Sequence, residues 1–249
     1  MHDSVADHYD VPDLARRILD AADEITVDAL AAVDEFHIGG RAATAQMARC
    51  VDLSPGHRVL DVGCGIGGTT RYLADRFGCD VTGVDLTQSF CDVAALLSER
   101  VGIKAAFRQG DALDLPFEDA SFDVVWTENI ADKARFYGEI RRVLKPRGQF
   151  AFHDVFAGPS GPVAYPVPWA GDASISHLAD IDALDWDGYE RTLWEDKTAE
   201  SATFFERMLA RPPRPLGMHL LQTRTSFENV LANLQSGAVR VVQAVLVRD

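Results

Sequence analysis

The segment LDVGCGIGG, residues 60–68, decides how the rest of the sequence is interpreted. Four of its nine residues are glycine, and Gly63, Gly65 and Gly68 fit the pattern G-x-G-x-x-G. Glycine tolerates positive φ angles and lets a ligand approach the backbone closely. The residues HRVLDVG are predicted to form a short buried strand, and TTRYLADRF a helix that ends near Gly78. The segment is therefore expected to be a ligand-binding loop between a strand and a helix.

Strand-like and helix-like segments alternate after this loop. The further predicted strands are CDVTGVDL (79–86), KAAFRQGDA (104–112), SFDVVWT (121–127) and QFAFHDVF (149–156). The predicted helices between them are SFCDVAALLSERVG (89–102) and KARFYGEIRRVL (133–144), the second of which ends at Lys145-Pro146. This alternation predicts βαβ units around a parallel sheet with helices on both faces, which is an α/β fold.

The two ends of the chain differ from this regular middle. Residues 12–50 are predicted to be mostly helical, with a break at Gly39 and Gly40 in the stretch VDEFHIGG. After residue 155 comes a Pro- and Gly-rich loop, AGPSGPVAYPVPWAG (157–171). The remaining predicted elements are a strand YERTLWED (189–196), helices TAESATFFERML (198–209) and SFENVLANLQ (226–235), and a final strand AVRVVQAVLVRD (238–249).

The composition limits the partners. The chain has 249 residues and a net charge of −14, so its surface repels phosphate backbones and anionic membranes, and neither is an expected partner. No stretch of the sequence approaches the ~20 apolar residues that span a membrane. The N-terminus, MHDSVADHYD, lacks the basic start and apolar run of a signal peptide, which predicts a cytoplasmic protein. The cysteines form no C-x-x-C pair, so no metal site is expected.

Asp61 indicates which ligand the glycine loop binds. A carboxylate beside the loop would repel a pyrophosphate, and the loop contains no Lys or Arg to balance one. A ligand with an ammonium group would be attracted instead. S-adenosylmethionine fits this description, because it has an amino acid tail and a positively charged sulfonium but no phosphate.

Two further acids follow predicted strands. Asp85 lies twenty positions after Gly65, where a carboxylate can accept hydrogen bonds from both ribose hydroxyls of NAD or S-adenosylmethionine. Asp111 follows the third strand and could accept a hydrogen bond from the adenine amino group. A helix N-cap for Asp85 and a turn-forming role for Asp111 are the alternatives.

Four segments together resemble a class I S-adenosylmethionine-dependent methyltransferase. They are VLDVGCGIGGTTRYLA, VTGVDLT, GDALDLPFEDASFDVV and FYGEIRRVLKPRGQF, and they cover residues 57 to 155. The chain looks most similar to the small-molecule subgroup that contains sarcosine/dimethylglycine N-methyltransferases and quinone C-methyltransferases. VDEFHIGG resembles the segment that closes over the methyl donor in that subgroup.

The resemblance implies a Rossmann-like α/β fold. Its seven-stranded sheet has the order 3-2-1-4-5-7-6, with strand 7 antiparallel, helices on both faces and an N-terminal helical lid. Residues 1–50 would form the lid or cap and residues 51–249 the methyltransferase domain, in which residues 156–238 contain the acceptor-site loops and helices.

The resemblance also assigns donor-binding residues. Asp61, Gly63 and Gly65 would line the methionine end, and Asp85 would bind the ribose. Leu86, Asp111 and Ala112 would meet the adenine, while His37 and Gly39 would lie over the donor. S-adenosylhomocysteine would be the product. For His37, a helix-capping or packing role is the alternative.

Candidate residues for the acceptor side are less specific. Glu128, His153 and Asp154 are candidate catalytic bases near the strand ends, since a hydroxyl or activated carbon must lose a proton. His153 could equally be a hydrogen-bonded strand-end histidine, and Glu128 a solvated loop acid. Tyr165, Trp169 and Trp194 are candidate acceptor-binding residues, because aromatic faces attract methylated ammonium groups. Packing over the core is their alternative role.

Four functions are compatible with these features of the sequence. The first is methyl transfer to a small-molecule acceptor, on an amine nitrogen as in sarcosine or dimethylglycine. The second is C- or O-methylation of a quinone-like or natural-product acceptor. A nicotinamide oxidoreductase and a non-catalytic sensor of the nucleoside cofactor are the others. The sequence leaves the acceptor and the oligomeric state open.

Overall fold

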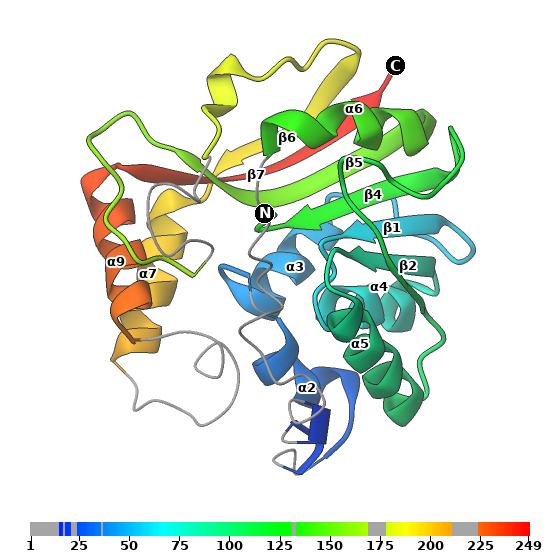
Figure 1. The fold of residues 1–249 in the computed structure, drawn as a ribbon. Coiled ribbons are helices and arrows are strands. Elements are labelled where there is room, and N and C mark those ends of the chain that lie inside the picture. The colour runs from blue at the N-terminus through cyan, green and yellow to red at the C-terminus, as the bar shows by residue number, and fades with distance from the viewer. Residues whose placement is uncertain are drawn as a thin grey trace.

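The structure is a computed structural model that describes residues 15, 16, 18–20, 24–35, 37–130, 133–168, 178–210 and 224–249. Within these residues, seven strands form one sheet in the order β3-β2-β1-β4-β5-β7-β6 (Figure 1). The strands are β1 (Arg58–Val62), β2 (Asp80–Asp85), β3 (Ala106–Gln109), β4 (Phe122–Glu128), β5 (Leu144–Ala157), β6 (Tyr189–Asp196) and β7 (Val239–Arg248). The predicted strand order is confirmed.

The direction of the strands places the predicted site residues at one edge of the sheet. The pairings among β1 to β5 are parallel, whereas β7 runs antiparallel to both β5 and β6, as predicted. In a parallel sheet the carboxyl ends of the strands lie at one edge, where ligands bind in α/β folds. The ends of β1, β2 and β4 carry Asp61, Asp85 and Glu128.

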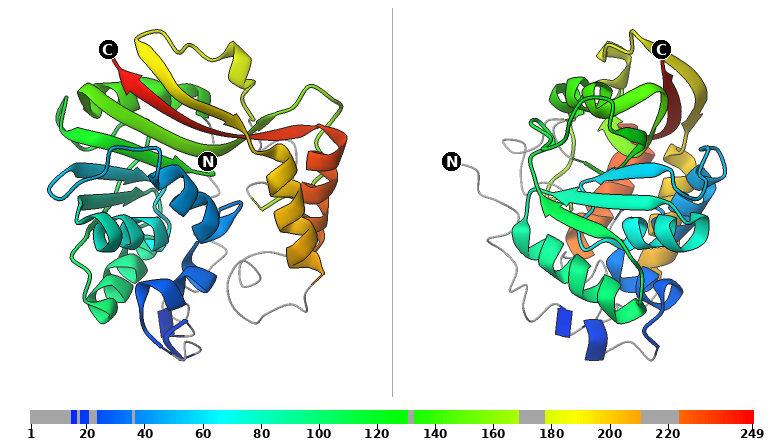
Figure 2. Two further views of the ribbon diagram at one scale, coloured as in Figure 1. Left: turned by 180° about the vertical axis from the view of Figure 1, so that it is seen from behind. Right: turned by 90° about the vertical axis from the view of Figure 1, so that its right-hand side faces the viewer.

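Helices cover both faces of the sheet. They are α2 (Val27–Asp34), α3 (Gly40–Ala48), α4 (Gly68–Phe77), α5 (Gln88–Val101), α6 (Lys133–Val143), α7 (Thr198–Leu209) and α9 (Arg224–Ser236), with a short 3₁₀ turn at Ile181–Ala183. Figures 1 and 2 show α6 on one side of the sheet and α3, α4 and α5 on the other. Helices α7 and α9 lie side by side, and they contact β7.

Glycines end two of these helices where the sequence predicts it. Gly78 follows α4 with a φ of 67°, and Gly102 follows α5 with a φ of 73°. Their backbone N–H groups bond to carbonyls of the last turn, which is the usual left-handed helix end.

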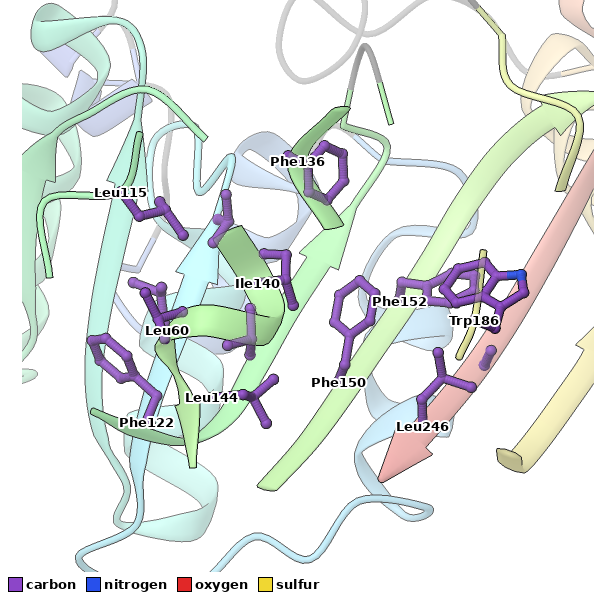
Figure 3. Close-up of a cluster of buried hydrophobic side chains, with 14 of the residues drawn as sticks. Leu60, Leu115, Phe122, Phe136, Ile140, Leu144, Phe150, Phe152, Trp186 and Leu246 are labelled. Atoms are coloured by element: carbon purple, nitrogen blue, oxygen red, sulfur yellow. The ribbon is translucent and has the colours of Figure 1, made fainter. Parts of the chain in front are cut away.

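Each sheet face has its own apolar core. Under α6, a cluster joins Leu60 of β1 and Ile140 of α6 to the aromatic rings of Phe150, Phe152 and Trp186 (Figure 3). On the other face, Met47 of α3 and Leu73 of α4 pack on β1, β2, β4, β5 and β7. Burial on both faces is why these strands read as apolar runs in the sequence.

The predicted start of the fifth strand was wrong. The helix was expected to continue to Leu144 and the strand to begin at Gln149, but α6 ends at Val143 and β5 begins at Leu144. Leu144 pairs with Phe122, and the register then shifts before Gln149 pairs with Val124. Lys145 is held over this irregular stretch by a 2.7 Å hydrogen bond from its Nζ to Asp123. The bulge thus includes Pro146, which lacks an N–H, in the strand.

In the parts of the chain that the structure describes, no helix is long and apolar enough to cross a membrane.

The N-terminal helices α2 and α3 lie against α4, where a lid is predicted. The division into a lid of residues 1–50 and a domain of residues 51–249 stays a prediction.

Candidate active site

The glycine loop connects β1 to α4 and has the backbone that the sequence predicts. Gly63, Gly65 and Gly67 all have positive φ angles, of 77°, 53° and 83°. A Cβ on Gly65 would meet nothing within 4 Å, so this part of the loop faces open space. A Cβ on Gly68 would lie 2.6 Å from the carbonyl oxygen of Asp34. Only glycine at position 68 therefore lets the end of α2 rest against the start of α4.

Asp85 ties the end of β2 to this loop. Its carboxylate accepts hydrogen bonds from the N–H of Gly65 and the N–H of Thr87, both at 2.9 Å. Burial raises the pKa of Asp85, and the two backbone bonds oppose that rise. The N-cap of α5 is Thr87, so the alternative N-cap role of Asp85 was wrong, although Asp85 accepts a bond from the N–H of that residue. Asp85 also lies beside the loop, where a ligand-binding role would place it.

The residues predicted to meet an adenine lie at neighbouring strand ends. Leu86 follows β2 and is 54% exposed. Gln109, at the end of β3, donates a 3.0 Å bond to the Leu86 carbonyl. The exposed Asp111 accepts a bond from Leu113 N–H, which is the turn-forming geometry, and Ala112 beside it is half-buried. An apolar surface flanked by acids is therefore present here.

Asp61 lies under the loop rather than at its opening. Its side chain is 3% exposed and accepts a 2.6 Å hydrogen bond from the Thr70 hydroxyl. Burial raises the pKa of Asp61 to about 7, and the charges of Glu128 and Asp85 add to this rise. A cation placed here would lower that pKa by favouring the ionised carboxylate. The predicted role of Asp61 toward a positively charged ligand stays a prediction.

Glu128 links the sheet to the N-terminal helices. One carboxylate oxygen accepts a 3.0 Å bond from the Thr44 hydroxyl of α3, and the other a 2.6 Å bond from the Thr69 hydroxyl of α4. Its side chain is only 6% exposed. The alternative role of Glu128 as a solvated loop acid was therefore wrong.

His37 lies over the same carboxylate. Its Nε2 is 3.0 Å from both the Gly40 carbonyl and the Thr44 hydroxyl, and 3.4 Å from Glu128. Gly39 precedes α3 with a φ of 85°, and this turn brings His37 back over the start of its own helix. The imidazole therefore both packs at the helix start and faces the candidate site.

Arg71 was not predicted, yet it anchors the loop. This fully buried side chain of α4 donates bonds to the carboxylate of Asp34, the carbonyls of Ile66 and Ala94, and Ser98. It joins α2, the glycine loop and α5. The sequence signal was weak, because a single arginine in an amphipathic helix normally lies in solvent.

Glu35 is a second buried acid at the end of α2 that the sequence analysis missed. Burial raises its pKa to about 8, although it is paired with Arg41. The guanidinium of Arg41 in turn lies 4.4 Å from the ring centroid of Tyr72. Together with Asp61, Asp85 and Glu128, Glu35 adds to the acidic character of the region around the loop.

His153 and Asp154 point to opposite faces of β5. His153 is 3% exposed, pairs in register with Glu128 and Gln243, and has its Nδ1 3.3 Å from the Gln243 side-chain oxygen. Burial lowers the pKa of His153 to about 4. Asp154 instead accepts bonds from the N–H groups of Ile130 and Val155. The structure therefore brings together Glu128 and His153 but not Asp154.

The two predicted acceptor aromatics that the structure describes, Tyr165 and Trp194, do not meet. Trp194 packs against Phe152 and Trp186 in the cluster under α6, on the face of β5 opposite to His153. Tyr165 packs in the apolar cluster of α7, α9 and the ends of β5 and β7. Trp169 lies outside the described residues. The packing role that the sequence left open is thus the observed environment of Trp194.

Comparisons with known proteins agree with this geometry. Residues 60–152 match the family model described as a methyltransferase domain. This part of the chain is thus similar to methyltransferase domains. The matched part contains the glycine loop, Asp85, Asp111 and Glu128, so the sequence-based expectation of a methyltransferase is confirmed for this domain.

The curated relatives match less than half of this chain in the two examples that follow. Tocopherol O-methyltransferase of Arabidopsis thaliana is 45% identical over 100 residues, which are 37% of this chain and 28% of that protein. Glycine/sarcosine/dimethylglycine N-methyltransferase of Actinopolyspora halophila is 38% identical over 121 residues, 46% of this chain and 21% of that protein. The chain therefore spans less than a third of the length of either relative.

A solved structure extends the similarity to the fold of the whole chain. Geranyl diphosphate C-methyltransferase from Streptomyces coelicolor A3(2), in complex with S-adenosylhomocysteine, has a TM-score of 0.71. The match covers 96% of this chain and 97% of that one, at 18% sequence identity. The methyltransferase domain and the segments around it therefore have the fold predicted from the sequence.

Proposed function

We propose that this protein transfers a methyl group from S-adenosylmethionine to a small organic acceptor. The observation that carries the proposal is the loop itself, in which Gly65 N–H donates to Asp85 and the buried Asp61 accepts a bond from Thr70. Asp85 would bind the ribose hydroxyls, and the exposed Leu86 would pack on the adenine. A nicotinamide dinucleotide suits this loop less well, because acids surround it and its segment contains no Lys or Arg.

The chain's own residues would supply positioning. S-adenosylmethionine provides a reactive methyl on a positively charged sulfur, and displacement requires the acceptor atom in line with that bond. Glu128 is fixed by hydroxyls from α3 and α4. Its carboxylate can orient an acceptor and receive the proton that an N–H, O–H or C–H group loses. His37 would close the site above it.

The methylated atom of the acceptor could be nitrogen, oxygen or carbon. An amine nitrogen, the first expectation from the sequence, is supported by Glu128, whose carboxylate would attract an ammonium group. Among the described residues, however, Tyr165 and Trp194 lie in separate clusters and form no aromatic cage. An oxygen or carbon acceptor on an uncharged compound is supported by the neutral side chains of His153 and Gln243 beside Glu128. We rank this second class first.

Calorimetry tests the donor part of the proposal. We expect S-adenosylmethionine and S-adenosylhomocysteine to bind with micromolar dissociation constants and NAD to show no heat. Asp85→Asn should weaken both sulfur nucleosides, whereas Asp92→Asn, an exposed acid of α5 bonded to Gln88, should not. Tight binding of NAD with no binding of S-adenosylhomocysteine would reject the proposal.

Turnover distinguishes an enzyme from a sensor. Phenols, quinols and amines would be incubated with S-adenosylmethionine, and formation of S-adenosylhomocysteine would be measured. Methylation of a phenol or quinol in preference to an amine supports the ranking given above. Donor binding without product across the panel would favour a non-catalytic sensor. The cytoplasmic location expected from the sequence stays a prediction.

A further inference from the structure

A line of polar side chains crosses the sheet next to Glu128. Glu128 of β4, His153 of β5, Gln243 of β7 and Glu195 of β6 are register partners in turn, and we name them the polar row. They project from the same face, because paired residues on neighbouring strands share a face.

The polar row interrupts an otherwise apolar surface. On one side of it, Ala151 and Val245 belong to the core under α3. On the other side, Val155 and Val241 belong to the cluster that also includes Ile38. Folding therefore places hydrogen-bonding groups between two apolar patches, a position that costs free energy unless those groups are satisfied.

The side chains at the two ends of the polar row have hydrogen-bond or ion-pair partners, whereas two polar atoms at its centre do not. Glu128 accepts bonds from two threonines, and Glu195 is 2.8 Å from Lys197. His153 and Gln243 bond to each other through one atom each. The second polar atom of each side chain, Nε2 of His153 and Nε2 of Gln243, is buried and has no partner among the described residues.

The chemistry of this pair is fixed whichever way the amide is turned. Burial lowers the pKa of His153 to about 4, so the imidazole is neutral near pH 7. With the amide oxygen toward Nδ1, Nδ1–H donates to it, which leaves the imidazole Nε2 as an acceptor and the amide NH₂ as a donor. Turning the amide exchanges these roles. In either state the pair presents one donor and one acceptor.

We propose that His153 and Gln243 bind a hydroxyl group of the acceptor molecule, and that this pair selects hydroxylated, apolar acceptors. The hydroxyl donates to one member of the pair and accepts from the other. A methyl ether lacks the donor, and a quaternary ammonium lacks both functions. The side chains beside the pair are apolar and would offer no hydrogen bond to a second polar group of such a molecule. This inference rests on the proposed methyl transfer and deepens it by naming the acceptor class.

The test uses the full chain saturated with S-adenosylhomocysteine. The probes are 4-propylphenol and 4-propylanisole, which differ only in whether the oxygen can donate. We expect the phenol to bind at least about tenfold more tightly by calorimetry, and its addition to shift the ¹⁵N resonance of His153 Nε2. The anisole should leave that resonance in place.

Two variants locate the effect. Gln243→Met and His153→Phe should each reduce the preference for the phenol to about threefold or less, while the affinity for S-adenosylhomocysteine stays within twofold. Glu195→Gln, a change at the edge of the polar row, should keep the preference and is the matched control. Unchanged binding of S-adenosylhomocysteine also reports that each variant is folded.

The outcomes separate this inference from the proposed function. If S-adenosylhomocysteine does not bind the unaltered protein, the proposed function itself fails. If it binds but the two probes have equal affinity, or neither binds, the hydroxyl-binding role is overturned and methyl transfer stands. A phenol preference that survives both Gln243→Met and His153→Phe also overturns it.

Discussion

Replacing Arg71 by methionine should cost this protein much of its stability. The guanidinium and the Asp34 carboxylate are 0% and 1% exposed and lie 2.7 Å apart. Removing one partner of a buried pair leaves an uncompensated charge and typically costs about 3–5 kcal/mol. Three further acceptors, at Ile66, Ala94 and Ser98, lose their donor as well. For a chain of this size, the melting temperature should fall by roughly 6–20 °C.

The same helix provides a matched control. Arg76 also pairs with an acid of the α2 region, Asp28, but the two side chains are 47% and 65% exposed. Thermal unfolding of Arg76→Met should therefore match that of the unaltered protein, since exposed pairs contribute little. The double variant Arg71→Met/Asp34→Leu should lose less than the sum of its single changes, with about 1–3 kcal/mol of coupling. Equal losses for Arg71→Met and Arg76→Met would refute the reasoning.

Other predictions follow from the site. Asp85→Ala should weaken S-adenosylhomocysteine by about 1.5–3 kcal/mol through lost charge-assisted bonds, and unchanged affinity in calorimetry would place the ribose elsewhere. The raised pKa values of Asp61 (about 7) and Glu35 (about 8) mean that the folded state holds protons that the unfolded chain has released. Their contribution to the stability of the donor-free protein therefore falls as pH rises from about 4 to 8, and denaturant titrations of Asp61→Asn and Glu35→Gln should show a smaller decline. For His153 the pH dependence of stability has the opposite sign, because its lowered pKa means that the unfolded chain takes up a proton below about pH 6.5 and the folded protein does not. The ring ¹H resonances of His153 should titrate with a midpoint below 5. Glu128→Gln should reduce kcat by about 10²–10⁴-fold if the carboxylate receives the proton, with little change in donor affinity, and a small effect on kcat would assign it positioning alone.

The fold was largely predictable because its signals are local. The glycines after β1 and the glycines that end α4 and α5 each specify one backbone conformation. The final strand was predicted from the valine-rich segment AVRVVQAVLVRD, and its antiparallel direction came from the family resemblance. The start of β5 was missed because the bulge at Pro146 depends on pairing with β4, which no local pattern encodes.

The site was only partly predictable because its key contacts are long-range. Arg71 meets Asp34 across 37 positions, and the buried state of either residue depends on the other. Trp194 was expected near the acceptor, but register across β7 places it on the face of Phe152. The same register places Gln243 beside His153, although neither residue's local sequence indicates that partner. Strand register thus determined which polar side chains meet.

The Glu128 carboxylate is held from two directions, by Thr69 of the domain and by Thr44 of α3. Its surroundings are complete only while the N-terminal helices remain docked. Exchange of those helices between homologous chains would change the contacts of this acid, and it would also replace Asp34, which pairs with Arg71 beneath the glycine loop. The surroundings of this buried acid are thus shared between the sheet and a segment that precedes it, so a change in either part reaches the same carboxylate.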